Sequence, residues 1–87
     1  MATDPRERIA AGRAALGLVI RTRREELELT RRELAELTGL SFGTIHHIEI
    51  GRRLPSLDSL DALARGLGTS ARTLLAGVSP WDDPPPS

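Results

Sequence analysis

Two adjacent histidines, His46 and His47, are the side chains of this sequence whose type best suits acid–base chemistry or metal binding. Neighbouring residues on a helix point about 100° apart, so the two imidazoles do not face one ligand. The chain has no cysteine, and no set of carboxylates or nucleophiles stands at ligand or catalytic spacing beside them. We therefore expect no enzyme, no metal ion and no cofactor, which leaves the histidines as a solvated surface or a binding surface.

Arginine is the second residue type that could carry a function. The 87 residues include 12 basic ones, all of them arginines, and 12 acidic ones, so the formal net charge is +0. The net charge gives no support for a polyanionic partner, but phosphate binding depends on whether arginines gather on one surface. Two arginine pairs, Arg31-Arg32 and Arg52-Arg53, lie on either side of the histidines in the sequence.

The elements that position these residues are predicted to be helices. Asp4-Pro5-Arg6-Glu7 is typical of a helix start, and the helix should run to about residue 27. Gly12 and Gly17 indicate close helix packing. The apolar stripe expected to face the core consists of Ile9, Leu16, Ile20 and Leu27.

Two short helices follow, with a three-residue turn between them. Thr30 and Glu33 form a capping box for the first, whose apolar positions include Leu37, and Gly39 stops it. Ser41 caps the second, expected from about 42 to 50. This spacing is typical of a helix-turn-helix whose second helix enters the major groove.

Two more helices complete the expected all-α fold, one over 57 to 67 capped by Ser56 and one after Ser70 through residue 75. We place the helix-turn-helix domain at 1–77, with its helix-turn-helix core at 30–50. A proline- and aspartate-rich tail over 78–87 should be extended, and its Trp81 could dock on the domain or on a partner chain.

The sequence resembles the Cro/repressor-type helix-turn-helix family, also called the XRE family, over about residues 16 to 77. The resemblance implies a five-helix, lambda-repressor-like domain, usually a DNA-binding dimer that regulates transcription, with Arg24 paired to Glu49. The matching residues are Gly17, Ile20-Arg21, Arg24-Glu25, Leu29-Thr30, Glu33-Leu34-Ala35, Gly39-Leu40-Ser41, Thr44-Ile45, Ile48-Glu49, Gly51-Arg52-Arg53, Pro55-Ser56-Leu57, Leu60, Leu63-Ala64, Leu67-Gly68 and Leu74-Leu75.

The expected DNA contacts divide into base and backbone contacts. A helical wheel with Ser41, Ile45 and Ile48 inward turns Gly43, His46, His47 and Ile50 outward and places Phe42 at the boundary. The base-contact candidates are Phe42, Gly43, His46 and His47. A ring such as that of Phe42 suits a thymine methyl group, or it is a residue at the core boundary. The candidates for backbone contact are Arg31, Arg32, Ser41, Thr44, Arg52 and Arg53.

Four positions depart from the family pattern. Arg31 stands where glutamine is usual. Glu28 stands where glycine is usual before Leu29, so we expect either that the turn after the first helix is formed differently or that this helix ends elsewhere. Gly43 removes a side chain from the middle of the recognition surface, and Ile50 places an apolar group where a polar one is usual.

These observations predict a cytoplasmic, sequence-specific transcriptional regulator that binds double-stranded DNA, a homodimeric repressor on a palindromic operator, with no membrane segment. Two alternatives remain open at this point. One is the antitoxin of a toxin–antitoxin pair, which would also have a protein antagonist or toxin as partner. The other is a protein-interaction adaptor that has lost DNA binding.

Overall fold

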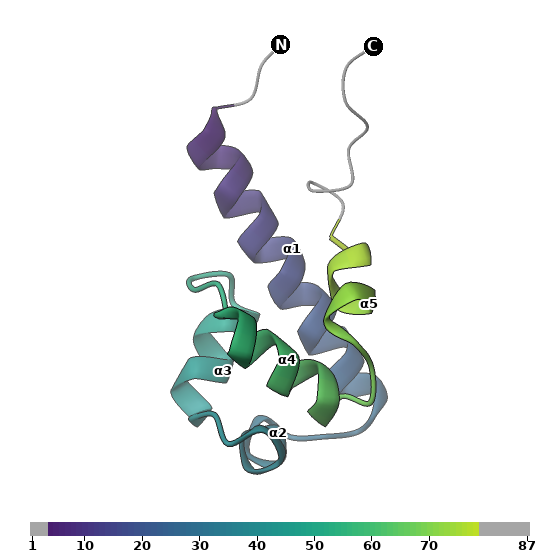
Figure 1. Cartoon of the computed structure of the whole chain (residues 1–87). Helices are drawn as coiled ribbons and strands as arrows, with labels where there is room; N and C mark the ends of the chain where they lie inside the picture. Colours follow the sequence, from purple (N-terminus) through teal and green to yellow (C-terminus); the bar gives the residue numbers. More distant parts are fainter. Residues whose placement is uncertain (1–3, 79–87) are drawn as a thin grey trace.

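The computed structural model describes residues 4–78, and within that range the chain forms helices and no strand. Each helix begins directly after a side-chain cap: Asp4, Thr30, Ser41, Ser56 and Ser70 each accept a hydrogen bond from a backbone N–H of the first turn. The predicted all-α fold is therefore present (Figure 1). The elements are α1 (Pro5–Glu26), α2 (Arg31–Thr38), α3 (Phe42–Glu49), α4 (Leu57–Gly66) and α5 (Ala71–Ala76).

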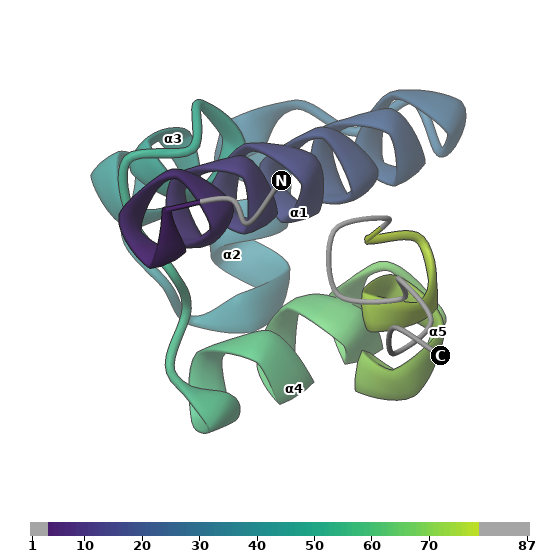
Figure 2. The same ribbon diagram turned by 90° about the horizontal axis from the view of Figure 1, so that it is seen from above.

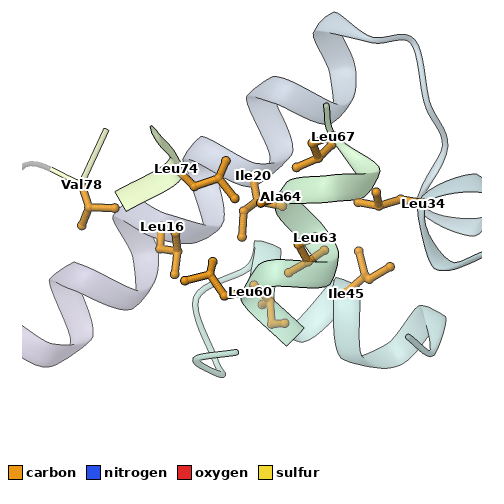
Figure 3. Close-up of a cluster of buried hydrophobic side chains, with 11 residues drawn as sticks. Leu16, Ile20, Leu34, Ile45, Leu60, Leu63, Ala64, Leu67, Leu74 and Val78 are labelled. Carbon is orange, nitrogen blue, oxygen red and sulfur yellow. The ribbon is translucent and has the colours of Figure 1, made fainter. Parts of the chain in front are cut away.

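The core lies where α4 packs between the other helices (Figure 3). Each helix contributes at least one aliphatic side chain that water does not reach, so no helix can leave without exposing apolar surface. The buried residues are Leu16, Ile20, Leu34, Ile45, Ile48, Leu60, Leu63, Ala64, Leu67, Leu74 and Val78.

Three apolar residues assigned to helix faces lie outside this core. Ile9 and Leu27, the ends of the predicted stripe on α1, are 49% and 40% exposed, and Leu37 of α2 is exposed as well. The buried residues of α1 lie between Gly12 and Arg24, so its first turns and the Leu27 that follows it are not covered by the other helices. The stripe prediction was right for Leu16 and Ile20 and wrong for its two ends.

The described part of the chain ends at a buried residue. Val78, assigned to the extended tail, is fully buried in the core cluster, and its N–H donates to the carbonyl oxygen of Leu75. Its side chain fills space beside Leu74 and Leu16 (Figure 3). The folded unit therefore reaches at least residue 78. Trp81 lies outside the described residues.

Helices α3 and α5 lie on opposite sides of α4 in two perpendicular views (Figures 1 and 2). The arrangement leaves α3 at one side of the molecule, in contact with α1 and α2. None of the helices in the described part of the chain has the length and apolar character to cross a lipid bilayer.

Candidate nucleic-acid interface

The turn between α2 and α3 consists of Gly39, Leu40 and Ser41. Gly39 has φ +74°, a left-handed conformation that favours glycine, and its N–H donates to the carbonyl oxygen of Ala35. The N–H of Leu40 donates to the hydroxyl oxygen of Thr38 at 3.3 Å. The turn is therefore hydrogen-bonded at successive residues and sets the angle at which α3 leaves α2.

Helix α1 supports the C-terminal end of α3 through a glycine. A Cβ atom added at Gly17 would lie 2.6 Å from the carbonyl oxygen of Glu49 and closer still to that of Ile48. The backbones of the two helices touch at this point, and any larger residue would push them apart. The close packing predicted for Gly17 is present.

A buried ion-pair network holds α3 from the same side. The Glu49 side chain is 0% exposed and accepts from Arg24 Nε at 2.7 Å and Arg24 Nη2 at 3.1 Å. Arg24 Nη1 also donates to the carbonyl oxygen of Leu29. The hydrogen bond to Glu49 raises the pKa of Arg24 above its ordinary value, against the opposing effect of burial. The structure thus contains the Arg24–Glu49 pair, in a bidentate geometry.

Arg31 belongs to this network, which the sequence-based assignment of Arg31 to the DNA backbone did not anticipate. Its Nε donates to Glu49 Oε1 at 2.9 Å, with the Arg31 side chain 28% exposed. Arginine has donors on three nitrogens, so the bond through Nε leaves the two terminal nitrogens for another acceptor. The usual glutamine is shorter than arginine and carries no charge to pair with Glu49.

The outward side of α3 carries the four predicted base-contact residues. Phe42, Gly43 and His47 are exposed, and His46 is half-buried. A Cβ atom added at Gly43 would meet nothing within 4 Å, so the fold itself does not require glycine there. Ile50, which directly follows the helix, is exposed too. The wheel was right that Gly43, His47 and Ile50 lie outward and wrong that Ser41 lies inward, because Ser41 is exposed. Contact of the four candidates with DNA stays a prediction.

The rings on this surface are stacked, which sequence reasoning missed. Phe42 and His46 lie nearly parallel, with centroids 6.4 Å apart and planes 6° apart. The guanidinium of Arg32, from α2, lies over the Phe42 ring with Cζ 5.7 Å from its centroid. The i,i+4 spacing of the two rings was a usable signal. No sequence pattern indicated that Arg32 would reach across from α2.

Two hydroxyl groups expected to contact phosphate are part of the α3 cap. Ser41 Oγ accepts from the N–H of Thr44 at 3.1 Å and donates to Thr44 Oγ1 at 2.8 Å. The one hydroxyl hydrogen of Ser41 is therefore in use. The hydroxyl hydrogen of Thr44 is the one that this arrangement leaves for an outside acceptor.

The second arginine pair follows α3 directly. Gly51 has φ +79°, and a Cβ atom there would lie 3.0 Å from Cα of Ala14 in α1. The N–H of Arg52 donates to the carbonyl oxygen of His47. This tight turn against α1 presents Arg52 and Arg53 as exposed residues at the C-terminal end of α3.

The turn after α1 contains a strained residue, at the position where the sequence departs from the family pattern. Glu28 has φ +58°, the left-handed conformation in which glycine is usual. Its N–H and that of Leu29 donate back to carbonyl oxygens of α1. The turn therefore has the backbone form that a glycine would adopt, and α1 ends at Glu26, so the expectation of a differently formed turn or a different helix end was wrong.

Comparison with known proteins places this geometry in a family. The family model described as Helix-turn-helix (HTH_3) matches residues 20–74. An uncharacterised HTH-type transcriptional regulator of Mycobacterium tuberculosis is 40% identical over 58 residues, which is 67% of this chain and 41% of that protein. An uncharacterised HTH-type regulator of Methanothermobacter thermautotrophicus is 48% identical over 50 residues, 58% of this chain and 72% of that protein. The match therefore spans about two fifths of the mycobacterial relative.

Solved structures agree with the fold. The restriction-modification controller protein C.AhdI of Aeromonas hydrophila superposes with a TM-score of 0.70 at 31% identity, covering 71% of this chain and 94% of that one. The clp gene regulator ClgR of Corynebacterium glutamicum superposes with a TM-score of 0.73 at 34% identity, covering 77% and 71%. The chain belongs to the helix-turn-helix family of the Cro/repressor (XRE) type.

Proposed function

We propose that this protein is a sequence-specific DNA-binding transcriptional regulator that inserts α3 into the major groove. The observation that carries the proposal is the division of α3 into two sides. Ile45, Ile48 and Glu49 hold it to the rest of the fold, while Phe42, Gly43 and His47 are exposed. A rigidly held helix with an open outer side is what base recognition in a groove requires.

Arginines at both ends of α3 support the same function. Arg31 and Arg32 begin α2, where the first amides and the helix dipole also attract phosphate. Arg52 and Arg53 follow the other end of α3. Arg32, Arg52 and Arg53 are exposed, so these arginines are available for phosphate contact although the net charge of the chain is +0.

We further propose a homodimer on a palindromic site. One α3 of 8 residues reads only a few base pairs, and two copies related by a two-fold axis double the contacts. The half-site centres would lie about 34 Å apart, one turn of B-DNA. We propose repression as the mode of action, because a dimer that covers promoter DNA excludes polymerase without needing a further contact.

The test is a DNA selection from a random duplex pool, followed by footprinting and gel filtration of the complex. We expect enrichment of a two-fold symmetric site and protection of two half-sites by a dimer. Enrichment of no sequence would overturn DNA recognition. A monomer that protects one short, unpaired site would overturn the dimer proposal alone. Equal transcription from the bound promoter with and without the protein would overturn repression.

A further inference from the structure

Phe42 is the only phenylalanine of the chain and lies at the first position of α3. Its side chain is 47% exposed and is not part of the core cluster. Full burial of such a ring would stabilise the fold by about 2 kcal/mol, so a half-exposed ring realises only part of this stabilisation. The ring therefore has apolar surface that DNA bound along α3 could cover.

The Phe42 ring already has two contacts within the protein. His46 stacks on it from the next turn of α3, and the Arg32 guanidinium lies 5.7 Å from its centroid. Contacts of this kind, ring against ring and cation against ring, restrict both torsions of the side chain. A restricted side chain loses little conformational entropy on binding, so its contact with a base contributes more to affinity.

The position beside the ring is open. Gly43 carries no side chain, and an added Cβ would meet no atom of the protein within 4 Å. A base pair can therefore approach the α3 backbone next to Phe42 more closely than a helix with ordinary side chains allows. The exposed apolar group that B-DNA presents in the major groove is the C5 methyl group of a pyrimidine.

We propose that the Phe42 ring, which lies beside Arg32 and His46, recognises the C5 methyl group of a pyrimidine. Thymine and 5-methylcytosine both carry this group, so binding would respond to methylation of cytosine at C5 as well as to thymine. The proposal rests on the DNA-binding function above and names the chemistry that one part of the site reads. The polar atoms of Arg32 and His46 can donate to acceptors on neighbouring bases or phosphates.

The experiment uses the operator from the random-pool selection and changes only methyl groups. Each thymine of one half-site is replaced in turn by uracil, which pairs identically and lacks the C5 methyl. We expect one position at which the dissociation constant rises about fourfold, the effect of exposing one methyl group. Uracil substitution without effect at every position would overturn the inference and leave the proposed function intact.

Two variants identify the side chain responsible. Phe42→Ala should bind the thymine and uracil operators equally at the sensitive position, because the ring that contacts the methyl group is gone. Leu57→Ala is the matched control: Leu57 is also an exposed apolar residue directly after a serine cap, at the start of α4. It should keep the full difference. A thymine preference that survives in Phe42→Ala would overturn the assignment to Phe42. Circular dichroism spectra and melting curves check that both variants are folded.

A second selection, from a pool in which 5-methylcytosine replaces cytosine, separates the two sources of the methyl group. Enrichment of 5-methylcytosine at the sensitive position identifies methylated DNA as a preferred ligand, and retention of thymine identifies thymine. Either result supports recognition of a methyl group. Enrichment of a pyrimidine without a methyl group, or of a purine, at this position would overturn it. Failure of both pools to yield a site would overturn the proposed function together with this inference.

Discussion

The inner and outer sides of α3 are built from different interactions. On the inner side, Ile45 and Ile48 are buried, and Glu49 accepts hydrogen bonds from two arginines. On the outer side, the Phe42 ring lies against His46 and Arg32, and a Cβ atom added at Gly43 would meet nothing within 4 Å. The residues of the inner side are determined by their contacts with the rest of the fold. The outer side can change with little effect on stability, and this separation lets one fold read many DNA sequences.

The largest loss of stability is expected for a substitution at Gly17. In Gly17→Ala the new Cβ would clash with backbone carbonyl oxygens of α3, which cannot rotate away as a side chain can. We expect a loss of about 3 kcal/mol in the free energy of unfolding and a melting temperature lower by roughly 15 °C. Thermal and urea denaturation measure it. An unchanged melting temperature would show that α1 and α3 are not in backbone contact.

The next effect in size concerns the buried ion pair. Arg24→Ala removes the two-bond partner of the fully buried Glu49 carboxylate, and Arg31 alone replaces part of the stabilisation. The expected loss is about 2 kcal/mol. Arg21→Ala is the matched control, because it breaks an exposed arginine–glutamate pair on the same helix and should change stability by less than about 0.5 kcal/mol. Equal losses of unfolding free energy in the two variants would contradict a stabilising role for the buried Arg24–Glu49 pair.

Arg31 tests the boundary between the two sides, because it bonds to Glu49 and its terminal nitrogens remain for phosphate. Arg31→Ala should cost less than about 1 kcal/mol of stability. It should also weaken binding to all DNA sequences alike, with the slope of log affinity against log salt reduced by about 1. Arg65→Ala, which breaks an exposed pair on α4, is the control and should leave binding unchanged. A salt slope in Arg31→Ala equal to that of the parent protein would remove Arg31 from the interface.

Gly43 should separate stability from binding. Because a methyl group fits there without contact, Gly43→Ala should raise the free energy of unfolding by about 0.5 to 1 kcal/mol through helix propensity alone. The same methyl group would stand between the helix and the base pairs, so affinity for the operator should fall. A stabilised variant with unchanged affinity would show that DNA does not approach the helix at this residue.

The smallest effect concerns the start of α2. Hydrogen bonds from the backbone and side chain of Thr30 lower the pKa of Glu33 below its ordinary value of 4.5. A lowered folded-state pKa stabilises the fold above the ordinary value, and this contribution is lost as the pH falls through the folded-state value. The variant Glu33→Gln keeps a capping amide without the titration. Its urea midpoint should therefore decline less between pH 6 and 3 than that of the parent protein, and parallel declines would contradict the prediction.

The sequence predicted the helices well because their starts depend on local chemistry. A cap such as Thr30 or Ser41 acts on N–H groups within three residues, so the signal and its effect lie together in the chain. Exposure at the ends of α1 could not be predicted in this way. Whether Ile9 and Leu27 are covered depends on how far the other helices reach, which is a property of the whole bundle.

In the candidate interface, too, local patterns predicted directions along a helix but not contacts between helices. The outward direction of Phe42 and His47 follows from helical periodicity, whereas the contacts of Arg31 and Arg32 depend on the angle between α2 and α3. Arginine side chains are long enough to reach several partners, so their identity and spacing do not determine which one they bind. The positive φ of Glu28 was not predicted, because glutamate has no preference for this conformation.

The burial of Val78 has a practical consequence for anyone who shortens this protein. A fragment cut at residue 74, where the family match ends, would lack Val78 and the last two residues of α5. It would lose the side chain that packs beside Leu16 and Leu74. Such a fragment could fail to bind DNA through loss of folding alone, so a minimal DNA-binding unit for crystallography or reporter fusions should extend to at least residue 78.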